Sequence, residues 1–400
     1  MTTQADTTQS RHSGPLAFGQ PAHRRPVRLL VAVTVAVLCL PAACTGSDDP
    51  KARKPAAAHD YWPTHGWRTA APADHGMDPA LPGRIDRQAA AIPELRSVLV
   101  VRGGYLVVGR YYGGATATAH QPVFSVTKSV TSALVGIALR EGHLHSLQQT
   151  VGELLADKLP ADADPRMATV TVQQLLTMTS GLPPDPDNRP VGMLASRDWV
   201  RFVLGRRLLH DPGEVFAYST EGSQLLSAIV ATSSGQTTLA FARHHLFGPL
   251  GIATQPAAEP VDTPENLSVY LRAGFAWARD PQGYHIGGGT LKLTSPDLAK
   301  LGYLYLNQGR WDRTQVVPAD YVGASTRTHS AGRDNASYGY HWWVETVRDH
   351  AAFFAQGAAG QFIEVVPDLD LVAVVTTSGE RPLDRSKTLI NSLIVPAVKQ

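Results

Sequence analysis

The stretch Phe124-Ser125-Val126-Thr127-Lys128 decides the fold, because it places a serine and a lysine three residues apart at the start of an apolar segment. Residues 125–140 are rich in helix formers and apolar on most sides, and Glu141-Gly142 follows them, which predicts a buried helix. Residues i and i+3 of a helix share a face, with Cβ atoms about 5–6 Å apart. The Lys128 amine can therefore reach the Ser125 hydroxyl.

This pair has the chemistry of a nucleophile and its base. A serine hydroxyl is a weak nucleophile that needs a neighbouring base. Lysine serves as that base when it is neutral, and burial disfavours the ammonium form. The positive end of the helix also disfavours the ammonium and helps to stabilise an oxyanion. A Ser-x-x-Lys spacing also arises by chance in long chains, so the pair alone does not establish catalysis.

Two later segments supply groups that such chemistry uses. Tyr218 precedes a predicted helix at 222–232, where its phenol can project into a cleft and relay a proton. Residues 353–362 are rich in small side chains and lead into a strand, so a backbone N–H there can join that of Ser125 in an oxyanion hole. A packing tyrosine and a Gly-rich turn are the ordinary alternatives. The order of the three segments favours catalysis.

The predicted elements place strands at both ends of the body and helices between them. A hairpin is predicted at 97–111 around Arg102-Gly103-Gly104. The remaining predictions are helices at 125–140, 171–178, 196–204, 222–232 and 295–307, strands at 340–347, 361–366 and 371–377, and a final helix at about 383–398. The two β ends most simply form one antiparallel sheet with a helical lobe inserted between them. Clefts between such lobes are favoured places for active sites.

The composition excludes several classes of function. The chain has 400 residues, of which 43% are apolar and 18% charged, as in an ordinary globular protein. A net charge of +2 without a basic stripe gives no basis for a nucleic-acid partner. Its two cysteines are Cys39 and Cys44, so no thiolate nucleophile or Cys-based zinc site can lie further along the chain. The His143/His145 and His244-His245 pairs lack zinc-binding spacing, and we expect no metal and no cofactor.

The first 60 residues predict export. A basic cluster at 23–28 precedes an apolar run at 29–40, which as a helix would be about 18 Å long and suits the h-region of a secretory signal. The run ends at Leu40-Pro41-Ala42-Ala43-Cys44, which resembles a bacterial lipoprotein cleavage site with Cys44 as the lipidated residue. Pro41 replaces the usual leucine, so simple secretion, an uncleaved anchor and a cytosolic location stay open. We expect a signal segment at 1–44, a flexible tether at 45–60, and a folded domain at 61–400 on the outer face of the cell membrane.

The three catalytic segments together resemble the β-lactamase-like, penicillin-recognising serine hydrolase family. The resemblance is greatest to the branch related to class C β-lactamases, with its esterases and 6-aminohexanoate-dimer hydrolases. It extends over about 80–395 through further segments at 174–182, 246–252, 288–291, 295–299 and 338–343. It implies an α+β fold of the β-lactamase/transpeptidase type, with an antiparallel sheet flanked by helices. That α/β lobe would take about 61–135 and 290–400, and an inserted, mainly helical lobe would take about 136–289.

The resemblance also implies roles for individual residues. Ser125 would be acylated, Lys128 would deprotonate it and Tyr218 would share the proton transfers. The third motif would end at Gly357, so that the backbone amides of Ser125 and Ala358 form the oxyanion hole. The expected substrate contacts are Thr220, Gln356 and Gly357, together with Trp342 as the member of the Trp342-Trp343 pair that lines the pocket.

Two departures from the family pattern bear on the substrate. Tyr-x-Asn becomes Tyr218-Ser219-Thr220, and Lys-Thr-Gly or His-x-Gly becomes Ala355-Gln356-Gly357. An amide and a cation that contact β-lactams and peptides are lost, which favours a small-molecule carboxylic ester or small amide. A D-alanyl-D-alanine carboxypeptidase acting on cell-wall peptide, a weak β-lactamase and a non-catalytic cell-wall-binding lipoprotein are the alternatives.

Overall fold

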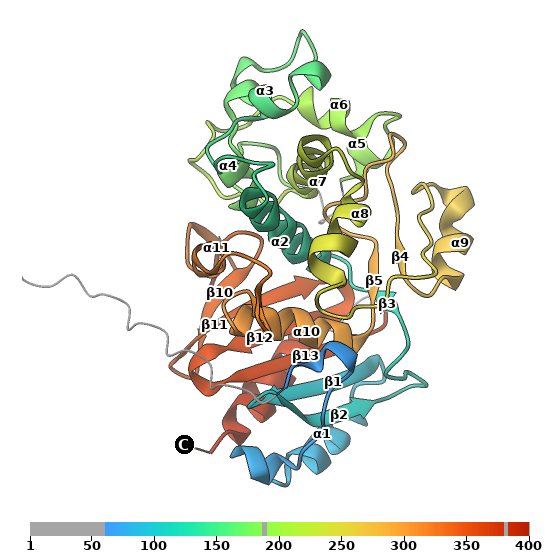
Figure 1. The fold of residues 1–400 in the computed structure, drawn as a ribbon, viewed down its shortest axis with the longest axis vertical. Helices are drawn as coiled ribbons and strands as arrows, with labels where there is room; N and C mark the ends of the chain where they lie inside the picture. Colours follow the sequence, from blue (N-terminus) through green and yellow to red (C-terminus); the bar gives the residue numbers. More distant parts are fainter. Residues whose placement is uncertain (1–60, 186–189, 380–382, 400) are drawn as a thin grey trace, which may run out of the picture. The chain divides into compact units, whose positions relative to one another are not determined.

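The computed structural model describes residues 61–185, 190–379 and 383–399, shown in Figure 1. An antiparallel sheet combines strands from the two ends of this region in the order β2-β1-β13-β12-β11-β10-β9-β8. Its strands are β1 (Leu95–Arg102), β2 (Tyr105–Tyr111), β8 (Ser330–Arg333), β9 (Ala336–Tyr338), β10 (Trp343–Val347), β11 (His350–Gly357), β12 (Gln361–Val366) and β13 (Leu371–Thr377). This confirms the prediction of one antiparallel sheet built from both β ends.

Side chains that point alternately to the two faces of the sheet are buried on both faces. In β1, Val98 and Val100 belong to one buried cluster, and Leu99 and Val101 belong to another. Successive side chains of a strand point to opposite faces, so a strand that is apolar at every position needs cover on both sides. Helices α10 (Ser295–Leu306) and α2 (Val126–Arg140) contact one side of the central strands, and α12 (Leu383–Leu389) contacts the other (Figure 1).

The remaining helices lie mostly in the middle of the chain. They are α1 (Leu81–Ala89), α3 (Val151–Leu154), α4 (Val172–Leu176), α5 (Val191–Leu194), α6 (Trp199–Leu204), α7 (Thr220–Ser234), α8 (Thr238–Ala242), α9 (Leu267–Arg272) and α11 (Ala319–Ser325). Helix α2 packs against α7 and against β11 and β12, so it joins the helical part to the sheet. Of its 15 residues, 126–138 are all buried, which confirms the predicted buried helix.

Two small sheets complete the fold. The first has the order β3-β5-β4, formed by β3 (Gln121–Pro122), β5 (Leu291–Leu293) and β4 (Ala276–Trp277). It pairs the residues just before Ser125 with a strand far along the chain. The second pairs β6 (Arg310–Trp311) with β7 (Thr314–Gln315). Among the described helices, none alone has the length and hydropathy of a membrane span, and residues 220–234 and 238–247 meet that test only as a pair bent by 77°.

Some element boundaries differ from the sequence prediction. The helix expected at 383–398 ends as an α-helix at Leu389 and continues as short turns of other pitch at 390–394 and 395–397, where Pro396 cannot donate a backbone hydrogen bond. The strand expected at 340–347 begins only at Trp343, because His341 has a φ of +57°. The predicted signal segment, Cys44 and the tether lie outside the described residues.

The close approach of α10 to the sheet yields a stability prediction. A Cβ at Gly302 would lie 2.6 Å from Cγ1 of Val372 and 2.7 Å from Cγ2 of Ile363. Since β-branched side chains are stiff, we expect Gly302→Ala to reduce the free energy of unfolding by about 1–3 kcal/mol in urea titrations. Gly323→Ala in α11 is the matched control, because nothing lies within 4 Å of its Cβ position. Equal stability of the two variants would contradict this packing.

Candidate active site

A strained turn presents Ser125 at the start of α2. The Val123 N–H donates to the Leu291 carbonyl (2.9 Å), which continues the pairing of β3 with β5. Phe124 then takes a φ of +48°, a left-handed conformation that is rare for a bulky side chain and is typical of functional sites. The Thr127 hydroxyl donates to the Phe124 carbonyl (2.6 Å) and holds this turn. Ser125 occupies the N-cap position, but its side chain makes no capping bond and is left for Lys128.

The Lys128 amine is buried and lies among three oxygen atoms. Its Nζ donates to Ser125 Oγ at 3.1 Å, to Thr220 Oγ1 at 3.0 Å and to the Gly288 carbonyl at 3.0 Å. The side chain is 1% exposed. The structure therefore brings Ser125 and Lys128 together as their i, i+3 spacing predicts.

The identity of the three partners determines what a neutral amine can do here. A neutral amine has two hydrogens and one lone pair, and the Gly288 carbonyl can only accept. When the Thr220 hydroxyl accepts the second hydrogen, the lone pair is left for the Ser125 hydroxyl proton. In its neutral form, Lys128 can therefore receive a proton from Ser125 without any rearrangement of its partners.

Thr220 and Gly288 are held in place by contacts between distant segments. The Thr220 N–H donates to Asp185 Oδ2 (2.7 Å) at the start of α7. A Cβ at Gly288 would lie 2.5 Å from Cγ2 of Thr220 and 3.1 Å from Lys128 Nζ, so a larger residue there would collide with the site. The roles of Asp185 and Gly288 were missed from the sequence, where only the run of three glycines at 287–289 marked a close backbone approach.

Tyr218 lies beside Lys128 and faces it with its ring. The Lys128 Nζ is 4.9 Å from the ring centroid, and the Arg333 guanidinium carbon is 4.8 Å from the same centroid. The ring stacks on Trp343 with centroids 6.0 Å apart. Among the described residues, the Tyr218 hydroxyl makes no hydrogen bond to Ser125 or Lys128. The Tyr218 ring thus lies within 5 Å of both the Lys128 amine and the Arg333 guanidinium carbon, measured to its centroid. Arg333 was missed because the β8–β9 hairpin that carries it was not predicted, although Asp334-Asn335 is a turn signal.

The predicted third motif ends next to the Ser125 turn. A Cβ at Gly357 would lie 2.3 Å from the Val123 carbonyl oxygen, so the end of β11 passes directly against the residues before Ser125. Ala358 follows and lines the same pocket as Ser125. Gln356 is half-buried in β11, opposite Phe362, and is not part of the pocket lining.

Trp342 does not lie where it was expected. It is 1% exposed and packs in the core against Tyr305 and Phe353, with ring centroids 4.5 Å and 5.3 Å away. The expectation that Trp342 lines the substrate pocket is therefore wrong. Its neighbour Trp343 faces the other way and stacks on Tyr218, so Trp342 packs in the core and Trp343 contacts a residue of the site.

A buried histidine supports the backbone of Lys128. His341 Nδ1 is 3.1 Å from the Lys128 carbonyl. Because that carbonyl can only accept, Nδ1 carries the hydrogen and Nε2 faces Ser223 Oγ at 3.5 Å. The Ser129 hydroxyl donates to the His341 carbonyl (2.7 Å). Burial, and then the charge of Lys128, lower the pKa of His341 to about 3, so this imidazole is neutral under ordinary conditions.

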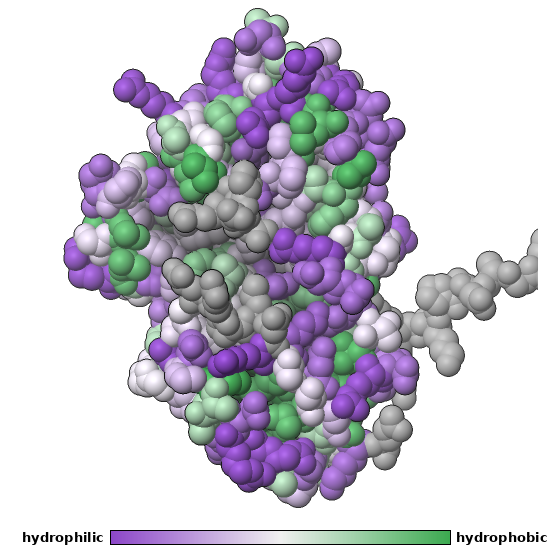
Figure 2. Space-filling model, turned by 180° about the vertical axis from the view of Figure 1, so that it is seen from behind, coloured by the Kyte–Doolittle hydropathy of each residue, from purple (hydrophilic) through white to green (hydrophobic). Residues whose placement is uncertain are grey.

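A large pocket opens beside Ser125. Its volume is about 720 Å³, within the range of roughly 300–1,000 Å³ that is usual for small-molecule sites. Ser125, Thr220, Gly288 and Ala358 lie on its reactive side. The remainder is mostly apolar and comes from α5, α6 and the segment that carries α9, whose protruding surface shows hydrophobic side chains in Figure 2. In the part of the chain that the structure describes, no group of three His, Cys, Asp or Glu side chains is placed to hold a metal ion.

The family model for beta-lactamase matches residues 84–393, which is most of the chain. The chain belongs to the beta-lactamase family. Members of this family are serine hydrolases, and the beta-lactamase/transpeptidase-like fold is the one described above. The recognition of this family from the Ser125, Tyr218 and 353–362 segments is thereby confirmed.

Individual beta-lactamase relatives are distant. The chain is 23% identical over 295 residues to Protein flp of Staphylococcus aureus (strain MW2), which covers 67% of this chain and 55% of that protein. It thus spans about half the length of the curated relatives it matches. A penicillin-binding protein homologue from Pyrococcus abyssi superposes with a TM-score of 0.60 at 19% identity, over 80% of this chain and 77% of the other. EstCE1, a hydrolase with promiscuous acyltransferase activity, superposes with a TM-score of 0.64 at 17% identity, over 79% and 98%. These two structures share the fold.

The three-partner geometry of Lys128 yields a reactivity prediction. Thr220→Val keeps the shape of the side chain but removes the hydroxyl, so the amine loses one of its three fixed partners. We expect Ser125 to react with a fluorophosphonate about tenfold to a hundredfold more slowly, the range that corresponds to one hydrogen bond to a charged or ionisable group. Thr220→Ser, which keeps the hydroxyl, should react at nearly the rate of the unmodified protein. Equal rates for the Val and Ser variants would contradict the role of this bond.

The neutral His341 yields a pH prediction. Between about pH 3 and pH 6.5 the unfolded chain binds a proton at this position and the native protein does not, so stability falls as the pH decreases through this window. His341→Asn keeps a donor near the Nδ1 position, suits the φ of +57° and does not titrate. From about pH 7 to about pH 5.5, we expect the variant to lose about 1 kcal/mol less unfolding free energy than the unmodified protein in urea titrations. Parallel pH dependences would show that His341 is not the responsible group.

Proposed function

We propose that the protein is an exported serine hydrolase that forms an acyl-enzyme at Ser125 and hydrolyses a carboxylic ester or a small amide. The observation that carries the proposal is the hydrogen bond of the buried Lys128 amine to the Ser125 hydroxyl at the mouth of a large pocket. Together with the strained Phe124 turn, it combines the two features that nucleophilic serine catalysis needs, a hydroxyl that lines the pocket and an adjacent base.

The proposed reaction proceeds by two acyl transfers. Neutral Lys128 takes the Ser125 proton as Oγ forms a bond to the substrate carbonyl carbon. The negative charge that develops on the carbonyl oxygen is stabilised by the backbone N–H groups of Ser125 and Ala358. The proton passes to the leaving alcohol or amine from Lys128 or through Tyr218, and water then attacks the acyl-enzyme and returns a carboxylic acid and free Ser125.

Features of the site support an ester or small amide over a β-lactam or peptide substrate. The Thr220 hydroxyl accepts a hydrogen bond from Lys128, and its side chain has no amide group that could bind a substrate. The third motif carries Ala355 in place of a cation, and the polar side chain of Gln356 that follows is not among the pocket lining. EstCE1, which shares the fold, is itself described as a hydrolase with promiscuous acyltransferase activity.

We further propose that Cys44 is lipidated after removal of residues 1–43, so that residues 45–60 tether the domain to the outer face of the cell membrane. The basic cluster, the short apolar run and the cysteine that follows Ala42-Ala43 support this location. Metabolic labelling with a palmitate analogue tests it, since Cys44→Ser should abolish incorporation.

Covalent labelling tests the proposed activity. Purified protein is incubated with a fluorophosphonate and with p-nitrophenyl acetate, beside Ser125→Ala. We expect a mass increase of one probe mapped to Ser125, and ester turnover, both absent in the variant. Labelling of a different serine would refute the assignment of the nucleophile. A folded protein with neither labelling nor turnover would instead favour a non-catalytic cell-wall-binding lipoprotein, and turnover of penicillins or D-alanyl-D-alanine peptides above that of esters would favour those substrates.

A further inference from the structure

The pocket beside Ser125 has an exposed apolar wall. Large hydrophobic side chains are rarely left open to water in numbers without a binding role. Eight of them are exposed in the described part of the chain, and four of the eight line this one pocket. These four, called the apolar wall below, are Phe124, Leu194, Leu267 and Leu271, with exposures of 38%, 40%, 53% and 59%. The concentration at one site is the first observation that points to a ligand.

Helix α9 carries two members of the wall and buries none of its residues. An amphipathic helix ordinarily buries its apolar face in the core. Here Leu267 and Leu271 face the pocket, and Val269, on the same helix, is also exposed but does not line it. The apolar side of α9 thus lacks cover from the described residues of the protein itself.

A buried lysine fixes α9 with respect to Ser125. Lys292 of β5 is 4% exposed, and its amine donates to the carbonyls of Tyr270 and Leu271 (3.3 Å each) and of Ala273 at the end of the helix. The negative end of a helix dipole favours a cation at this place. Because β5 also pairs with β3, which leads directly into the Ser125 turn, one strand holds both the nucleophile and α9.

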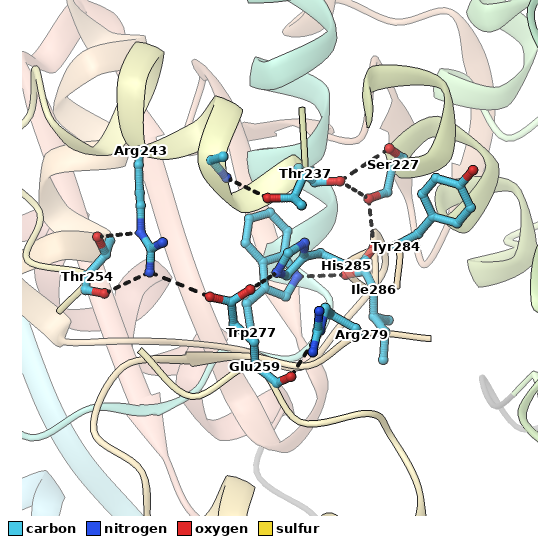
Figure 3. Close-up of polar contacts among 12 residues, drawn as sticks. Ser227, Thr237, Arg243, Thr254, Glu259, Trp277, Arg279, Tyr284, His285 and Ile286 are labelled. Atoms are coloured by element: carbon cyan, nitrogen blue, oxygen red, sulfur yellow. Dashed lines mark hydrogen bonds and ion pairs between the residues drawn. The ribbon is translucent and has the colours of Figure 1, made fainter. Parts of the chain in front are cut away.

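A polar network fixes the segment that leads to α9 (Figure 3). Arg243 donates through Nε to Thr254 Oγ1 (3.2 Å) and lies 3.8 Å from Glu259. Glu259 is 3.1 Å from Nε2 of the fully buried His285, and its carbonyl accepts from Arg279 Nε (3.0 Å). These contacts join the helical turn at 243–247, which follows α8, to the segment that contributes Pro260 and Val261 to the pocket. These contacts therefore fix the position of the apolar wall, although its side chains are exposed.

The charges of the lining residues that the structure describes match a neutral ligand. Among the described lining residues, Asp262 is the one charged side chain, and the residue is exposed. A substrate carboxylate would meet no Lys, Arg or His in that lining and would be repelled by Asp262. Further in, the lining is again apolar, with Met193, Trp199 and Ile286 all buried.

We propose that the apolar wall binds the acyl chain of the substrate, so that the ester cleaved at Ser125 is an uncharged medium- or long-chain acyl ester of about eight carbons or more. The proposal rests on the proposed function and adds the substrate class to it. The chain would enter with its carbonyl at Ser125 Oγ and extend between Leu194 and α9. Ser125 forms the acyl–oxygen bond, the alcohol leaves with the proton, and water releases the fatty acid.

Chain length at a constant leaving group tests the proposal. Each methylene that leaves water gains up to about fourfold in binding, the equivalent of about 0.8 kcal/mol. For full-length protein with monomeric p-nitrophenyl esters, we expect kcat/KM to rise from acetyl to octanoyl by at least about tenfold. Leu271→Asn and Leu267→Asn should each lower the octanoyl-to-acetyl ratio by about fivefold or more. Leu209→Asn is the matched control, since Leu209 is 59% exposed, as Leu271 is, but does not line the pocket.

The possible results separate this proposal from the proposed function. Preference for the acetyl ester with normal fluorophosphonate labelling of Ser125 would overturn the acyl-chain proposal and leave the hydrolase. Absence of labelling and of all turnover would overturn both. A preference for octanoyl that Leu271→Asn and Leu267→Asn leave intact would place the chain elsewhere and overturn the proposal. A rate of octanoyl ester hydrolysis that rises only with phosphatidylglycerol vesicles, and falls as much in Val269→Asn as in Leu271→Asn, would show that α9 binds membranes. That result would also overturn the acyl-chain proposal.

Discussion

The hydrogen bond from the buried Lys128 amine to Ser125 Oγ is the interaction on which the rest of the site depends. A buried amine is stable only when its hydrogens have partners, and the three partners here come from three separate parts of the chain. Ser125 starts α2, Thr220 starts α7 and Gly288 precedes β5. Helix packing and the small sheet β3-β5-β4 must therefore both be correct before the Lys128 amine can meet the Ser125 hydroxyl.

Neighbouring residues hold the three partners of the Lys128 amine in fixed positions. The absence of a side chain at Gly288 lets its backbone approach Lys128 and Thr220. Asp185 accepts a hydrogen bond from the Thr220 N–H, and neutral His341 donates one to the Lys128 carbonyl. The same strand β5 that follows Gly288 positions α9 through Lys292. The Ser125–Lys128 pair and the apolar wall are thus linked by one short element, which gives a physical reason for the proposed fixed relation between a substrate carbonyl at Ser125 and its acyl chain on the wall.

Much of the fold could be predicted from local sequence, because the continuous β-rich runs at 97–101 and 371–377 and the apolar helix at 125–140 are strong local signals. The Ser125–Lys128 contact could also be predicted, since both residues lie on one helical turn. Asp185, Gly288, His341 and Arg333 could not be assigned their roles, because each acts through a contact with a residue far along the chain. Trp342 shows the converse error: the two adjacent tryptophans, of which Trp343 begins β10, face opposite ways, but the sequence does not say which one faces the core. The apolar wall was missed because α9 is only six residues long and has no buried face to give a helical pattern.

Rapid-mixing kinetics test whether Lys128 activates Ser125 for acyl transfer. Excess p-nitrophenyl ester is mixed with the protein, the nitrophenol released in the first turnover is recorded, and the protein is quenched and mapped by mass spectrometry. We expect a burst of up to one equivalent, an acyl group on Ser125, and loss of both in Lys128→Met, which keeps the side-chain bulk without the amine. A burst of equal rate in Lys128→Met, or an acyl group on any other residue, would contradict this activation.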